Sequence, residues 1–121
     1  MIIATVLNEK KIIVPIIEGK IIRVYDSEKK TYEDFENPAI HLKEGRRGAA
    51  LRFTKKKGAV AFGAPPQTFC DLSYEKAKSE GILFYQLEEG TSFEKFQEIV
   101  KSNRLKAQKE LPTNEIAPSF S

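Results

Sequence analysis

Three short runs of apolar residues predict the central strands of a buried sheet. They are Met1–Leu7, Ala59–Phe62 and Ile82–Leu87. A strand that is apolar at nearly every position has both faces covered, which is typical of parallel strands packed between helices. We therefore expect the three runs to be neighbouring, parallel strands in the centre of one sheet.

The segment between the first and second of these runs predicts an antiparallel hairpin. Lys20–Asp26 is rich in β-branched side chains, and Thr31–Glu36 mixes aromatic with acidic residues, so one side of the hairpin is expected to face solvent. The apolar run Ile12–Ile17 contains Pro15, which argues against a central strand there because proline donates no backbone hydrogen bond.

Other segments have the spacing of amphipathic helices. The pattern predicts helices over Arg46–Lys57 and Gln67–Glu80, and a third helix that begins at the capping box Thr91-x-x-Glu94. Strands that alternate with helices pair in parallel through right-handed crossovers. The predicted fold is therefore an α/β domain of three layers, α/β/α, with a mixed five-stranded sheet to which the hairpin adds the antiparallel part.

The periodic pattern ends at Leu105. Prolines, an asparagine and serines are scattered through the residues that follow, and few apolar side chains are available to anchor them. We assign residues 1–105 to one α/β domain and residues 106–121 to a flexible C-terminal tail. Deleting Pro112–Ser121 is expected to leave the melting temperature nearly unchanged.

Composition narrows the classes of function. The chain has 121 residues and a net charge of +3 with interleaved signs, which does not favour nucleic-acid binding. No apolar run reaches membrane-spanning length, and one cysteine permits no internal disulfide bond, which suits a reducing cytosol. We expect a cytoplasmic protein of one domain with no membrane partner.

The sequence carries no pattern that indicates catalysis. Two-metal chemistry needs carboxylates on core strands, and neither Met1–Leu7 nor Ala59–Phe62 contains one. No phosphate-binding loop, dinucleotide fingerprint or Gly-x-Ser-x-Gly elbow is present. We therefore expect a protein that is not an enzyme.

His41 and Cys70, the one histidine and the one cysteine of the chain, are the candidate metal ligands. Ligands of open α/β sheets bind where parallel strands end, and both residues are expected near that edge. Each also has a simpler interpretation, His41 as an exposed loop residue and Cys70 as a small buried hydrophobe on the inner face of its helix. Arg46 and Arg47 also have two interpretations: they bind an anion at a helix N-terminus, or they form a solvated basic turn.

Several short motifs resemble one family. The run Glu36-Asn37-Pro38-Ala39, the following His41 and the helix start Gly48-Ala49-Ala50 are similar to NifX-like proteins of nitrogenase iron-molybdenum cofactor biosynthesis, a group that includes the C-terminal domain of NifB-type proteins. The resemblance covers Met1 to Leu105. It implies a ribonuclease-H-like motif and the binding or carrying of an iron–sulfur or iron-molybdenum-type cluster. The cofactor-binding residues carried over are Gly19, Lys20, Asn37, His41, Arg46, Gly48 and Gly63, with His41 and Cys70 as the metal ligands.

One element of the family pattern is missing. Family members carry a His-Phe-Gly-Arg sequence between the first two strands, where this chain reads Pro15-Ile16-Ile17-Glu18-Gly19-Lys20 and the histidine is absent. Gly19-Lys20 stands where Gly-Arg would be.

Two functions remain open on these residues. The first is a non-catalytic carrier of a metallocluster, with cluster donor and acceptor proteins as partners and a homodimer as one possible assembly. The second is a degenerate family member that has lost its cofactor and acts as a protein-interaction or regulatory module. A third interpretation, binding of a small anion or nucleic acid by Arg46, Arg47, Arg52 and Lys55–Lys57, would show a steep salt dependence.

Overall fold

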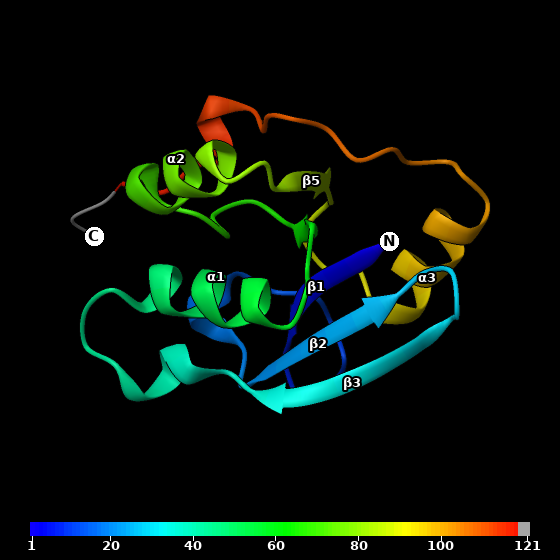
Figure 1. Cartoon of the computed structure of the whole chain (residues 1–121), viewed down its shortest axis with the longest axis horizontal. Coiled ribbons are helices and arrows are strands. Elements are labelled where there is room, and N and C mark those ends of the chain that lie inside the picture. Colours follow the sequence, from blue (N-terminus) through cyan, green and yellow to red (C-terminus); the bar gives the residue numbers. More distant parts are fainter. Residues whose placement is uncertain (119–121) are drawn as a thin grey trace.

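The computed structural model describes residues 1–118, which form one mixed five-stranded sheet and three α-helices. The strand order is β3-β2-β1-β4-β5, with β2 antiparallel to both of its neighbours and β1, β4 and β5 parallel (Figure 1). The strands are β1 (Ile2–Leu7), β2 (Ile21–Asp26), β3 (Thr31–Glu36), β4 (Ala61–Ala64) and β5 (Leu83–Gln86), and the helices are α1 (Arg46–Lys56), α2 (Asp71–Ser79) and α3 (Phe93–Lys101).

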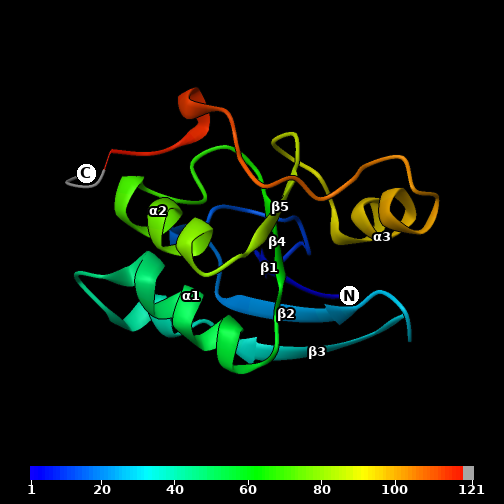
Figure 2. The ribbon, with the colours of Figure 1, turned by 45° about the horizontal axis from the view of Figure 1, so that its top comes forward.

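The helices cover the sheet from two sides. Figure 2 shows α1 and α2 on one side of β1, β4 and β5, and α3 on the other. Along β1 the side chains alternate between two apolar clusters: Ala4 and Val6 join the cluster that includes α1 and α2, and Ile3 and Leu7 join that of α3. All four are fully buried, so β1 is apolar at successive positions because both of its faces are covered.

These features confirm the predicted α/β class, the three layers and the mixed five-stranded sheet. The three apolar runs are neighbouring parallel strands, as expected, but the expected central position is wrong for β5, which is an edge strand of the sheet. The finer assignment to a ribonuclease-H-like motif stays a prediction. None of the helices formed by residues 1–118 is long and apolar enough to cross a lipid bilayer.

Three predicted boundaries are wrong. The strand expected over Ala59–Phe62 is β4, which starts two residues later because the turn after α1 extends through the amide of Ala59, bonded to the Thr54 carbonyl. Helix α2 starts at Asp71 instead of Gln67. The third helix is capped by Ser92, whose Oγ accepts the Lys95 amide at 3.0 Å, whereas the hydroxyl of Thr91 donates to the Glu88 carbonyl.

The predicted tail contacts the rest of the fold in the part that the structure describes, and its flexibility stays a prediction. Residues 106–117, which we call the C-terminal strap, run along the outer side of β5 and past α2 (Figure 1). The Gln108 amide donates to the Phe84 carbonyl at 2.7 Å, and the Phe84 amide donates to the Gln108 carbonyl at 2.7 Å. Leu111 and Ala117 are buried. Regular structure in the strap is limited to the short 3-10 turn η3 (Thr113–Glu115). The part of the predicted tail that comprises residues 119–121 lies outside the described residues.

Backbone hydrogen bonds hold the strap in addition to its few buried side chains, and backbone bonds leave no side-chain pattern in the sequence. Phe84 is fully buried, and within the described residues no strand lies beyond β5. The outward amide and carbonyl of Phe84 therefore need partners, because unpaired buried backbone groups are costly. Gln108 supplies both.

We expect Phe96→Ala to lower the free energy of unfolding by about 3–5 kcal/mol, because it empties a fully buried site under the sheet. The Phe96 ring packs edge-on against Tyr85, with centroids 5.5 Å apart. Urea denaturation measures the loss. As a control, Leu72→Ala at a position 73% exposed should change stability by less than about 0.5 kcal/mol. A loss below about 1 kcal/mol for Phe96→Ala would contradict the packing described here.

Candidate functional site

A cavity opens where α1 and α2 begin. The two helices lie on the same face of the sheet, and their N-termini are at the edge where β3 and β4, the strands that precede them, end. This is the edge at which open α/β sheets bind ligands. The cavity has a volume of about 530 Å³. Its lining residues are Lys43, Glu44, Gly45, Arg46, Arg47, Gly48, Cys70, Leu72, Ser73 and Lys76.

The cavity is electropositive. Four of its lining side chains are cationic and only Glu44 is acidic. Lys43 and Arg46 form no ion pair with any residue in the described part of the chain. The free backbone amides at the start of each helix add further positive potential.

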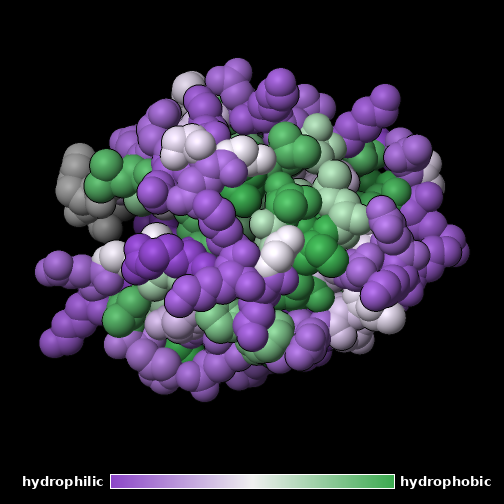
Figure 3. Space-filling view, viewed as in Figure 1, coloured by the Kyte–Doolittle hydropathy of each residue, from purple (hydrophilic) through white to green (hydrophobic). Residues whose placement is uncertain are grey.

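The N-terminus of α1 is positively charged, whereas negative charge stabilises a helix N-terminus. Acidic residues stabilise a helix N-terminus because they oppose its dipole, but α1 begins with Arg46 and Arg47 and has no acid in its first turn. Figure 3 shows a hydrophilic surface along this helix. An anion bound between these arginines would relieve the repulsion, so the arrangement favours an anionic ligand.

Cys70 is the N-cap of α2 and is partly buried. Its sulfur lies 3.3 Å from the Oγ of Ser73 and also accepts the Ser73 amide, while the Cys70 amide donates to Ser73 Oγ at 2.9 Å. Burial acts to raise the pKa of the thiol, but the hydrogen bonds from Ser73 and the charge of Arg47 outweigh it, so the pKa of Cys70 is lowered. The thiolate is the form that binds metals. Cys70 is therefore not the inward-facing core residue considered from the sequence.

Arg47 connects the two helices at the cavity. Its Nε donates to the Thr68 carbonyl at 3.2 Å, and its Nη2 donates to the Gln67 carbonyl at 3.4 Å. The side chain thus reaches from α1 to the segment that leads into Cys70, and its charge lies near the thiol.

His41 is at the end of the 3-10 turn η2 (Pro38–His41) and does not line this cavity. Its Nε2 lies 2.5 Å from the Oε1 of Glu36, and both side chains are about two-thirds exposed, at 66% and 68%. Among the described residues, no group of three or more His, Cys, Asp or Glu side chains is arranged to hold a metal ion. The structure brings Arg46, Gly48 and Cys70 together and leaves His41 outside that group.

Two predicted cofactor-binding residues, Asn37 and Gly19, instead serve the fold. The Nδ2 of Asn37 donates to the carbonyls of Ile16 and Gly19 at 2.8 and 2.9 Å, and its Oδ1 accepts the Ala39 amide, so this fully buried side chain ties two loops together. A Cβ on Gly19 would lie 2.6 Å from the Leu7 carbonyl oxygen, so no larger residue fits there.

Gly63 and Lys20 are also separate from the cavity. Gly63 lies within β4, where a Cβ would come 3.1 Å from the Cγ2 of Thr5 beneath α3. Lys20 is exposed and borders a shallow hollow with Asn8 and Glu18. Close packing therefore explains the glycine at position 63, and exposure to solvent explains the lysine at position 20.

Sequence reasoning missed Lys43, Ser73 and Lys76 as cavity residues. One signal could have found Ser73. The pattern Cys70-x-x-Ser73 before a helix has the three-residue spacing of a reciprocal cap, with sulfur in place of the usual hydroxyl. Lys43 and Lys76 come from different elements and have no common pattern in the sequence.

No protein-family model matches this chain, and no curated protein is similar to it in sequence. Solved structures do share its fold. The apo form of the orange protein from Desulfovibrio gigas is 16% identical, with a TM-score of 0.73 over 88% of this chain and 91% of that one. A Thermotoga protein that is proposed to be a NifB protein and belongs to the DUF35 family is 17% identical, with a TM-score of 0.67 over 92% of this chain and 96% of that one.

We expect Ser73→Ala to slow alkylation of Cys70 by iodoacetamide at neutral pH. The substitution removes a hydrogen bond that lowers the pKa of the thiol, so the pKa rises and less thiolate is present. The rate is measured by mass spectrometry as a function of pH. Ser79→Ala is the matched control, because the Ser79 hydroxyl bonds to the Lys76 carbonyl at the other end of α2. Equal rates and pH profiles for the two variants would contradict the assignment.

Proposed function

We propose that this protein is a non-catalytic carrier of an anionic, sulfide-containing metallocluster, which it binds in the cavity between the N-termini of α1 and α2. One observation carries the proposal: a partly buried thiol of lowered pKa faces a cavity that four cationic side chains line. The cluster is cargo, so it needs to be held and released and not chemically changed.

The donor set fits a preassembled cluster better than a bare metal ion. A cluster built on the protein uses about four thiolates, and this chain has one cysteine. A cluster that arrives with its own sulfides needs fewer protein ligands and carries negative charge. Cys70 would supply one thiolate, and Lys43, Arg46 and Arg47 would balance the charge.

Two further observations support this class of cargo. The sequence resembles NifX-like proteins of nitrogenase cofactor biosynthesis over residues 1–105. The fold is shared with a protein proposed to be a NifB protein and with the orange protein, whose structure is of an apo form. Cluster donor and acceptor proteins are the partners in this proposal.

The alternative is an interaction or regulatory module without cargo. The missing His-Phe-Gly-Arg element favours it. So does the finding that no three metal-binding side chains within residues 1–118 are grouped to hold a metal ion. The two functions differ in a measurable way, because only the carrier takes up metal.

We expect the wild-type protein to take up iron and sulfide under anaerobic reconstitution, giving charge-transfer absorption and bound metal by elemental analysis. Cys70→Ser should lose most of this uptake, and Lys43→Glu combined with Arg46→Glu should weaken it, because both changes act inside the cavity. His41→Ala is the matched control and should keep uptake, because His41 lies outside the cavity.

The outcomes separate the alternatives. Loss of uptake in His41→Ala with retention in Cys70→Ser would move the site to η2. No uptake by the wild-type protein, with folding verified by circular dichroism, would favour the interaction module.

A further inference from the structure

The C-terminal strap reaches the candidate site from the side opposite α1. At its end, the strap pairs with the segment Gln67–Asp71, in which Cys70 lies. The Gln67 amide donates to the Glu115 carbonyl at 2.8 Å, the Ala117 amide donates to the Phe69 carbonyl at 2.8 Å, and the Asp71 amide donates to the Ala117 carbonyl at 3.2 Å. The last of these satisfies one of the free amides at the start of α2.

The segment before Cys70 is held from two sides. On one side Arg47 binds the carbonyls of Gln67 and Thr68, and on the other the strap binds the amides of Gln67 and Asp71. Gln67 has a φ of +72°, a left-handed conformation that is costly for a residue other than glycine. Such a conformation persists only where surrounding contacts impose it. At Gln67 itself, the strap accepts the amide and Arg47 donates to the carbonyl.

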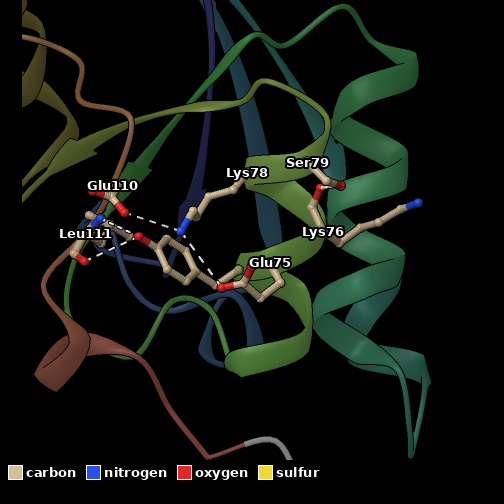
Figure 4. Close-up of polar contacts among 7 residues, drawn as sticks. Glu75, Lys76, Lys78, Ser79, Glu110 and Leu111 are labelled. Carbon is tan, nitrogen blue, oxygen red and sulfur yellow. Dashed lines mark hydrogen bonds and ion pairs between the residues drawn. The ribbon is translucent and has the colours of Figure 1, made fainter.

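A tyrosine on α2 fixes the middle of the strap. The buried hydroxyl of Tyr74 accepts the Leu111 amide at 2.8 Å and donates to the Leu111 carbonyl at 3.3 Å, so it takes the place of a strand partner. Figure 4 shows Lys78 between Glu75 and Glu110, next to Leu111. The ammonium of Lys78 lies 4.9 Å from the centroid of the Tyr74 ring and 3.4 Å from Glu110 Oε1.

We infer that the C-terminal strap is a positioning element for the cavity: when it is docked, it holds the Gln67–Asp71 segment, and with it Cys70, in the arrangement that binds cargo. The second half of this inference rests on the proposed function. Because docking of the strap and binding at Cys70 share one segment, the two are thermodynamically linked, and each favours the other. Release of the strap is then a route to release of cargo to an acceptor.

The test uses Tyr74→Phe in the full chain. This substitution keeps the ring and removes the hydroxyl, so the Leu111 amide loses its partner. The matched control is Tyr85→Phe on β5. Tyr85 is a tyrosine of similar overall burial whose hydroxyl contacts the sulfur of Met1 and not the strap. The readout is hydrogen exchange at the amides of Gln67 and Asp71, compared with the amides of Ala4 and Val6 in β1.

We expect exchange at Gln67 and Asp71 to be about tenfold faster in Tyr74→Phe, which corresponds to about 1.4 kcal/mol of local opening, with β1 unchanged. Tyr85→Phe should leave Gln67 and Asp71 as in the wild type. If exchange at the two sites is unchanged, or rises equally in β1, the strap does not position the segment and the inference is overturned.

A second measurement separates this inference from the proposed function. After anaerobic reconstitution with iron and sulfide, Tyr74→Phe should retain less cluster than Tyr85→Phe on dilution. Faster exchange with equal retention would overturn the coupling to cargo. If the wild type takes up no cluster, the proposed function fails, whereas faster exchange at Gln67 and Asp71 still supports positioning of Cys70.

Discussion

The need to pair the outer backbone groups of β5 organises much of this molecule. β5 is the last strand of the sheet, yet Phe84 at its centre is fully buried, and a buried amide or carbonyl without a partner is costly. Gln108 provides both partners, and this brings the C-terminal strap onto the surface of α2. From there the strap continues to the segment that carries Cys70. The backbone requirement of one edge strand is thus connected to the geometry of the cavity.

The opposite edge of the sheet is stabilised by side chains. Arg23 on β2 is buried, and its guanidinium makes a bidentate contact with Asp34 on β3 at 2.7 and 2.9 Å. It also lies over the rings of Tyr32 and Phe93, 3.7 and 4.6 Å from their centroids, which attaches β3 to α3. The hydrogen bond with Asp34 raises the pKa of Arg23, and the same contact lowers the pKa of Asp34. Because the Asp34 side of the ion pair is partly exposed, solvent screens it and its contribution to the free energy of unfolding is small. The contact mainly fixes the orientation of the two side chains.

The cavity combines features that are unfavourable for the empty protein. Two arginines begin α1, against the helix dipole, and Gln67 is held in a left-handed conformation beside the cavity thiol. Binding sites commonly contain such unfavourable arrangements, because the surrounding structure enforces them and the ligand relieves them. Here Arg47 and the strap hold Gln67 in this conformation, and an anion bound in the cavity would offset the charge of the two arginines.

Much of the fold could be predicted from the sequence, because apolar runs and helix spacing are local properties. Met1–Leu7, the hairpin and the helix over Arg46–Lys57 follow from which side chains avoid water, and their alternation with helices sets the parallel pairing. Arg46 and Gly48 could be placed at a helix start from the sequence, whereas Cys70 was singled out as the one cysteine and not as the N-cap of α2.

Only the tertiary structure decided the rest. The strap has few apolar side chains and docks partly through backbone groups, which every sequence possesses, so no periodic side-chain pattern marks it. Asn37 matched a family motif, but its burial between two loops makes it a structural residue, and the close approach of Leu7 explains Gly19. His41 and Cys70 are separated because η2, which ends at His41, lies outside the cavity that Cys70 lines at the start of α2. Long-range geometry of this kind comes from packing, which local pattern does not contain.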